Sequence, residues 1–196
     1  MIEPLPTPFI DDKLAYKPVR LSESTITELM IPSYSNFGGK IHGGILLSLM
    51  DKVAYVCAAK HAGNYCVTAS IDTVDFLAPI EVGELVSLMA SVNYVGKTSL
   101  VVGIRVVSEN VKTNSVKHTN TSYFTMVAKD ENNQPTQVPG LILENPQEVR
   151  RFVEAIRRKE LRQNYKQEVE QIKAPVNYER CEELLIGERC RLVTRA

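Results

Sequence analysis

The sequence predicts an α+β protein in which one apolar helix packs against a single antiparallel sheet. Residues 45–62 contain no Gly or Pro, have the length of a helix and carry apolar side chains almost all round it. Four segments rich in Val, Ile, Thr and aromatic residues follow, and short links of the hairpin type join the last three. A helix that is apolar on nearly every side needs cover from other elements, and a single antiparallel sheet can bury one face of it.

The composition is that of an ordinary soluble globular protein. Hydrophobic residues make up 44% of the 196 residues and charged residues 23%, which is typical of a domain with a core of its own. The 23 basic and 23 acidic residues cancel. The net charge therefore gives no reason to expect nucleic acid or an anionic membrane as the main partner.

The N-terminus and the cysteines indicate a reducing compartment. Residues 1–13 carry prolines and acids where a signal peptide needs a basic start and an apolar run, and no segment approaches the ~20 apolar residues that span a bilayer. The four cysteines form no CxxC pair and do not cluster with the three histidines, so no metal site is expected. We therefore predict a cytoplasmic protein with reduced thiols.

The predicted elements follow one another as strand, helix, four strands and a second helix. We expect an N-terminal arm over residues 1–15, a domain over 16–140, and a C-terminal helix and tail over 141–196. The strands are expected within 18–31 and at 66–76, 85–95, 99–109 and 116–129, and a charged second helix at 145–169. Residues 171–196 show no clear pattern.

Residues 32–44 form a glycine-rich loop that leads directly into the apolar helix. Backbone amides near Gly43 and Gly44 are free at the helix N-terminus, where the helix dipole favours negative charge. Two turns further on, Asp51 shares its helical face with apolar residues, among which a carboxylate is costly to bury unless it is paired. The two features together suit an oxyanion site beside a general base or nucleophile.

Each feature also has a more ordinary interpretation. A lone aspartate in a helix is more often solvated or structural than catalytic. The short segment His42-Gly43-Gly44 is a common kind of turn, and His42 by itself is more typical of a loop or packing histidine than of a base. The residues alone leave both interpretations open.

Residues 36–51, NFGGKIHGGILLSLMD, resemble the signature of the hotdog thioesterases. They fit N-x-x-G-x-x-H-G-G followed by an apolar helix with an acid seven residues after the last glycine. The continuation from VTASIDTVDF to SYFTMVAKDE resembles the acyl-CoA hydrolase subgroup, so the resemblance covers about residues 20–160. It implies a hotdog fold, in which a curved antiparallel sheet wraps a long central helix, here with a C-terminal helical extension.

The resemblance also implies an assembly and a catalytic pair. Members of the family join two sheets into a dimer whose active sites lie at the interface, and these dimers commonly assemble into hexamers. The family's catalytic asparagine and acid match Asn36 and Asp51. Since one chain carries both, a homodimer would hold two complete active sites.

A second family segment concerns coenzyme A. Gly96-Lys97-Thr98-Ser99 matches a segment that lies near the CoA nucleotide in the family, and a lysine beside two hydroxyls suits phosphate. A plain hairpin turn is the alternative. The substrate-binding residues expected to contact CoA are His42, Lys97, Thr98 and Ser99. CoA is part of the substrate, and neither a cofactor nor a metal is implied.

Sequence and resemblance together predict an enzyme that hydrolyses fatty acyl-CoA to free fatty acid and CoA. In this hypothesis Asp51 is general base or nucleophile, Asn36 positions water or the carbonyl, and amides of Gly43 and Gly44 hold the oxyanion. One alternative, a hotdog dehydratase or hydratase, pairs a histidine with an acid, and His42 is misplaced for that by family comparison. The other, a non-catalytic acyl-CoA-binding regulator, usually carries a DNA-binding segment, and the second helix has no helix-turn-helix partner.

Overall fold

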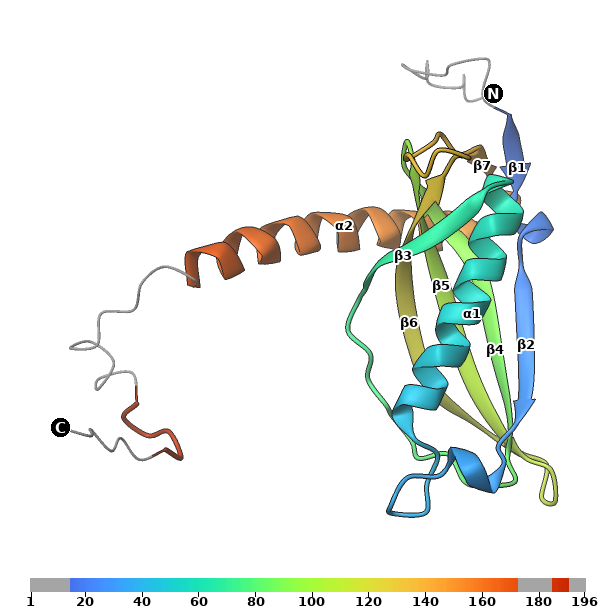
Figure 1. Ribbon diagram of the computed structural model, residues 1–196, viewed down its shortest axis with the longest axis vertical. Helices are drawn as coiled ribbons and strands as arrows, with labels where there is room; N and C mark the ends of the chain where they lie inside the picture. The colour runs from blue at the N-terminus through green and yellow to red at the C-terminus, as the bar shows by residue number, and fades with distance from the viewer. Residues whose placement is uncertain (1–14, 173–184, 191–196) are drawn as a thin grey trace. The chain divides into compact units, whose positions relative to one another are not determined.

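Figure 1 shows the computed structural model of the chain, which describes residues 15–172 and 185–190. The elements are β1 (Tyr16–Pro18), a 3-10 turn (Val19–Leu21), β2 (Ser24–Leu29), a 3-10 turn (Pro32–Tyr34), α1 (Gly43–Ala62), β3 (Tyr65–Ile71), β4 (Leu85–Val95), β5 (Ser99–Asn110), β6 (Ser115–Lys129), β7 (Gly140–Ile142) and α2 (Pro146–Ile172). Two compact units divide between Ala155 and Ile156, so α2 begins in the first and continues in the second. Most of the expected arm and much of the tail lie outside the described residues.

Five strands form one antiparallel sheet in the order β2-β4-β5-β6-β3. The strands curve around α1, which lies along one face of the sheet (Figure 1). Residues alternate along β4: Val86 and Leu88 are completely buried on the side of α1, whereas Met89 is exposed on the other side. The expected arrangement of one helix on a curved antiparallel sheet is confirmed.

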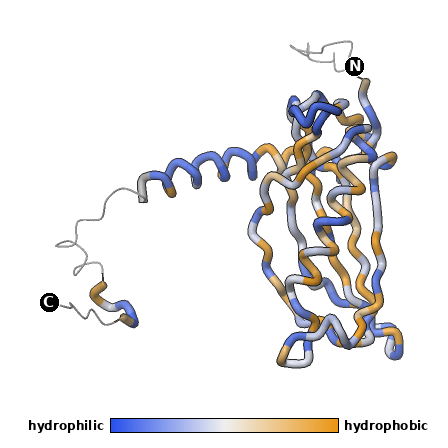
Figure 2. Tube along the Cα trace, viewed as in Figure 1, coloured by the Kyte–Doolittle hydropathy of each residue, from blue (hydrophilic) through white to orange (hydrophobic). Residues whose placement is uncertain are grey.

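The hydrophobic core lies between α1 and the sheet. Met50, Val53 and Cys57 of α1 are fully buried there, together with Phe124 of β6. Figure 2 shows apolar residues concentrated along α1 and the strands, while α2 is largely hydrophilic. Burial of each large apolar side chain contributes roughly 1.5–3 kcal/mol, so this layer holds α1 rigidly in place.

Several element boundaries differ from the sequence prediction for local reasons. α1 begins at Gly43, two residues earlier than expected, because His42 caps the helix. β3 ends at Ile71 and not at residue 76: the strand bulges between Thr68 and Ser70, and such a bulge bends the strand away from its partner. The parallel pair of β1 and β7 was not predicted, because three residues are too few to show alternation.

One face of α1 is not covered by its own chain. Asp51 and Lys52 are exposed there, and so are Tyr55 and Val56, each to 40%. The expectation of cover all round the helix is therefore wrong within one chain. The neighbouring strand β3, whose Tyr65 ring lies 5.9 Å from that of Tyr55, is at the edge of the sheet. Such an edge leaves backbone groups open to pairing with another chain.

Among residues 15–172 and 185–190, no helix is long and apolar enough to cross a membrane. Within the same ranges, no three His, Cys, Asp or Glu side chains gather in a way that could hold a metal ion.

Candidate functional site

The N-terminus of α1 is capped by His42. The ring Nδ1 of His42 accepts a hydrogen bond of 2.8 Å from the Gly44 amide, and the His42 carbonyl accepts from Ile45 at 3.0 Å. This arrangement uses the Gly44 amide that the sequence assigned to an oxyanion. The Gly43 amide donates to no group among the described residues, and as the first amide of α1 it lies at the positive end of the helix dipole.

Asn36 organises the loop that precedes α1. Its side-chain oxygen accepts hydrogen bonds from the backbone amides of Gly38 at 2.9 Å and Lys40 at 3.2 Å, and the backbone N–H of Asn36 donates to the Lys40 carbonyl at 2.7 Å. The Lys40 side chain forms an ion pair with Glu81, which ties the loop to the segment before β4. Because the oxygen is occupied in this way, the Asn36 NH2 group is left as a donor toward a ligand.

Asn36 and Gly43 both line a cavity of about 420 Å³ at this end of α1. The other lining residues are largely apolar: Ile41, Leu46, Phe76, Ala78, Pro79 and Ile80, with Lys40. The ring of Phe76 lies directly over Gly43, where an added Cβ would come within 3.2 Å of it. Glycine therefore lets the ring approach the helix start. The cavity joins two hydrogen-bond donors to an apolar wall.

Asp51 lies further along α1 and is held by a residue that the sequence prediction missed. Thr68 of β3 donates a hydrogen bond of 2.6 Å to Asp51 Oδ1. Asp51 is exposed in the single chain, whereas Ala54 and Ala58, expected on the same face, are fully buried. The predicted apolar surroundings of Asp51 are thus wrong within one chain. Alternation along β3 puts Thr68 on the same side as buried Cys66, the side of α1, and this signal could have identified it.

Within one chain, these residues form two separate groups. Asn36 and Gly43 share the cavity, Asp51 and Thr68 share a hydrogen bond, and Asp51 does not line the cavity. Gly43 and Asp51 are eight residues apart in α1, which corresponds to about 12 Å along the helix axis. That separation is too large for both groups to touch one thioester carbonyl.

The predicted CoA segment lies elsewhere. Lys97 and Thr98 lie in the tight turn between β4 and β5, and Ser99 begins β5; the Gly96 amide closes the turn by donating to the Ser99 carbonyl at 2.7 Å. Figure 1 shows this turn at the end of the sheet that adjoins the C-terminus of α1, opposite the loop of Asn36. The 20 residues of α1 span about 30 Å. The Lys97 side chain is exposed.

Comparison with known proteins identifies the family. Residues 38–114 match the model of the thioesterase superfamily. Protein VdlD of Helicobacter pylori is 49% identical over 134 residues, which cover 68% of this chain and 76% of that protein. YkhA of Bacillus subtilis, named as an uncharacterized acyl-CoA thioester hydrolase, is 36% identical over 140 residues, which cover 71% of this chain and 81% of YkhA. The chain belongs to the thioesterase superfamily. Within it the chain is a hotdog-fold enzyme of the acyl-CoA thioester hydrolase group.

Solved structures of this group share the fold. A hexameric acyl-CoA thioesterase superimposes with a TM-score of 0.76 at 38% identity, covering 78% of this chain and 97% of its own. An acyl-CoA hydrolase from Staphylococcus aureus in complex with butyryl coenzyme A and coenzyme A has a TM-score of 0.74 at 33% identity, covering 80% and 96%. Variants of the S. aureus enzyme with alanine in place of an asparagine, an aspartate and a threonine have also been solved.

Proposed function

We propose that this thioesterase hydrolyses fatty acyl-CoA with Asp51 as its catalytic carboxylate. The observation that carries this role is the short hydrogen bond from Thr68, which fixes the Asp51 carboxylate on a rigid helix. Asp51 either activates a water molecule or attacks the thioester carbonyl directly, and both routes end in free fatty acid and CoA. In the first route, the CoA sulfur leaves as a thiol after it takes up the proton that the water has lost. In the second route, CoA leaves as the Asp51 carboxylate forms a mixed anhydride with the acyl group, and water then cleaves the anhydride to fatty acid, restores the Asp51 carboxylate and supplies the proton for the CoA thiol.

Asn36 and Gly43 supply the donors for the carbonyl oxygen in this proposal. The Asn36 NH2 group and the Gly43 amide line the same cavity, and both are left as donors by the hydrogen bonds around them. Donors already in position lower the barrier because they need not reorganise as the oxyanion develops. Gly44 is a weaker candidate than Gly43, since His42 accepts from its amide.

The S. aureus variants support this choice of residues. In that enzyme the asparagine and aspartate that were changed to alanine are 15 residues apart, and the threonine lies 17 residues beyond the aspartate. Asn36, Asp51 and Thr68 have the same two spacings here. We infer that the three residues act in one site.

We further propose that each complete site forms between two chains. Within one chain the Gly43 amide lies about 12 Å along α1 from Asp51, and Asp51 does not line the cavity of Asn36 and Gly43, so a second copy has to supply the missing half. The uncovered apolar face of α1 and the open edge of β3 adjoin Asp51 and offer the surface for that copy. The hexameric relatives support an assembly of such dimers.

The carboxylate role is tested with Asp51→Asn, which keeps the size of the side chain and removes its charge. Release of CoA thiol from fatty acyl-CoA should fall by at least about two orders of magnitude, while CoA binding and the far-ultraviolet circular dichroism stay unchanged. Near-normal turnover in the folded variant would rule out Asp51 as base or nucleophile. Lys52→Gln, a change at the next exposed residue of α1, is the matched control.

A further inference from the structure

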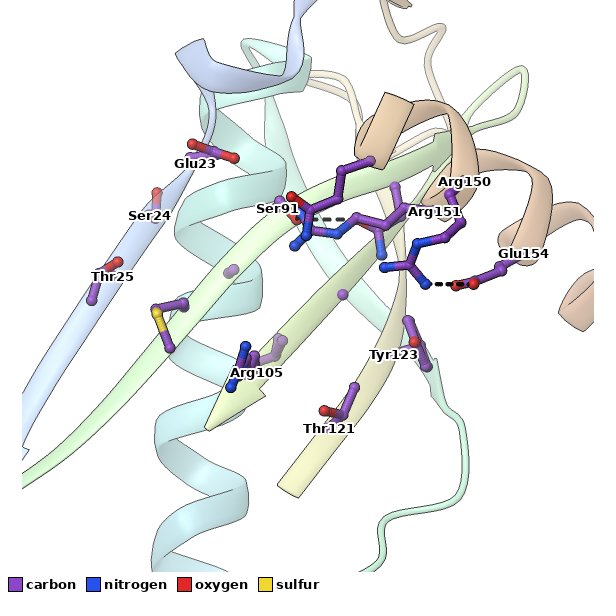
Figure 3. A pocket seen from close by; sticks show the side chains of 16 residues that line it. Glu23, Ser24, Thr25, Ser91, Arg105, Thr121, Tyr123, Arg150, Arg151 and Glu154 are labelled. Carbon is purple, nitrogen blue, oxygen red and sulfur yellow. Dashed lines mark hydrogen bonds and ion pairs between the residues drawn. The ribbon is translucent and has the colours of Figure 1, made fainter. Parts of the chain in front are cut away.

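The face of the sheet opposite α1 carries a second cavity, of about 560 Å³. Its floor is formed by β4, β5 and β6, and residues 147–154 of α2 form one wall (Figure 3). The cavity shares no lining residue with the cavity at the N-terminus of α1. Its volume is within the range of cavities that hold small-molecule ligands, yet the proposed hydrolysis does not use it.

A glycine in the floor of this outer cavity leaves space there. Gly103 pairs with Ser91 on one side and with Tyr123 on the other, so the middle position of this row has no side chain. The Asn93 amide occupies the space beside it, and a Cβ on Gly103 would collide with the Asn93 nitrogen. Any larger residue at position 103 would fill the floor.

Asn93 places an unused donor in the cavity. The residue is 95% buried, and its oxygen accepts a hydrogen bond of 3.1 Å from Ser91. Its NH2 group donates to no partner within residues 15–172 and 185–190. This nitrogen is not among the fully enclosed polar atoms that lack a partner in the described part of the chain, so it is open to the cavity. A ligand that enters the cavity can therefore bring an acceptor to the Asn93 NH2 group.

Positive charge surrounds the same space. Arg105 stands on the next row of the sheet and forms no ion pair among the described residues, and Arg151 makes only a long contact of 3.4 Å with the Ser91 hydroxyl. Figure 3 shows Arg105 on β5 and Arg151 on α2 at two sides of the cavity. Two carboxylates, Glu23 and Glu154, also line it, but Glu154 pairs with Arg150 at 2.6 Å. Two guanidinium groups are thus left without a carboxylate partner in the described part of the chain.

We propose that this outer cavity binds a small phosphorylated molecule, whose phosphate is held by Arg105 and Arg151 with the Asn93 amide. A phosphate carries close to two negative charges at neutral pH and three acceptor oxygens, which matches two guanidinium groups and one neutral donor. A carboxylate would leave one of the arginines uncompensated. The volume exceeds that of a bare phosphate, so the remainder holds the rest of a small molecule, against Met89 and Tyr123.

The proposal is tested on the full-length protein by calorimetric titration with inorganic pyrophosphate. Wild type should bind it, more weakly as salt is added. Replacing both Arg105→Ala and Arg151→Ala should raise the Kd at least about tenfold, since each arginine contributes a charge-assisted contact. Lys112→Ala, which removes a positive charge from the exposed turn between β5 and β6, should leave the Kd unchanged. Should the double variant not fold, Arg105→Ala alone provides the same test on an exposed side chain.

Competition separates this site from the substrate site. Saturating CoA should leave pyrophosphate binding unchanged, and the arginine variants should keep their hydrolysis of acyl-CoA in the absence of pyrophosphate. The proposal is overturned if wild type binds no pyrophosphate, if CoA displaces it, or if the arginine variants bind it as tightly as wild type does. None of these results bears on Asp51, so the proposed hydrolysis stands or falls separately.

Discussion

The hydrogen bond from Thr68 to Asp51 gives the sharpest test of the site. Thr68→Val keeps the shape of the side chain and removes the hydroxyl that donates over 2.6 Å to Asp51 Oδ1. A hydrogen bond to a charged group contributes about 1.5–3 kcal/mol. If the bond holds the carboxylate in its reactive position through the transition state, kcat/KM should fall by a factor of about 10 to 150. Thr68 and Asp51 are both exposed in the single chain, where water can replace the lost bond, so the free energy of unfolding of the chain should change by no more than about 0.5 kcal/mol.

Thr68→Ser is the matched control, since it retains the hydroxyl and loses only a methyl group. Thiol release from a fatty acyl-CoA is measured for wild type and both variants, with urea unfolding to check stability. The serine variant should stay within a fewfold of wild type and the valine variant should lose activity. The reasoning fails if valine retains wild-type kcat/KM, or if serine and valine lose activity equally, because the methyl group and not the hydroxyl would then matter.

Three further predictions concern CoA, assembly and pH. If Lys97 contacts the CoA phosphates, Lys97→Ala should raise KM for acyl-CoA and reduce its salt dependence, but hardly alter hydrolysis of a short thioester without the nucleotide; equal effects on both substrates would indicate a structural turn. Mixing inactive Asn36→Ala with inactive Asp51→Ala under subunit exchange should restore roughly a quarter of wild-type activity per protomer, as about half of the dimers carry one intact site; hybrids that native mass spectrometry detects but that stay inactive would refute the shared site. Burial lowers the pKa of His61 from its usual 6.5. As the pH falls below 6.5, the unfolded chain therefore takes up a proton at His61 that the folded chain does not, and this favours unfolding. Urea titrations should therefore show a free energy of unfolding that is retained above pH 6.5 and decreases below it, and less so in His61→Gln.

The long elements could be predicted because their patterns are long. β4, β5 and β6 have 11, 12 and 15 residues, enough to show alternation, and their ends match the prediction within one residue. α1 has 20 residues without an internal break. β1 and β7 have three residues each and pair across more than 120 positions of sequence. Their pairing depends on the tertiary structure, and a local sequence pattern does not contain that information.

The candidate site was predicted in part for a related reason. Asn36, Gly43 and Asp51 lie in one continuous segment, so a local motif can contain them. Thr68 acts through a contact between a helix and a strand, and its position depends on how β3 meets α1. The outer cavity was not foreseen either, because Gly103 becomes the floor of a hollow only when three strands pair in register.

The exposure of Asp51 also follows from what a helical pattern leaves undetermined. When apolar residues surround a helix, periodicity does not say which face the sheet covers, and here the uncovered face holds Asp51 beside Tyr55 and Val56. A solvated carboxylate is a weak base and a weak nucleophile. A second chain on that face would exclude water from Asp51 and bring the donors of Asn36 and Gly43 to the opposite side of the thioester. Covering one surface would therefore bury the apolar stripe, complete the proposed site and desolvate the Asp51 carboxylate in a single step.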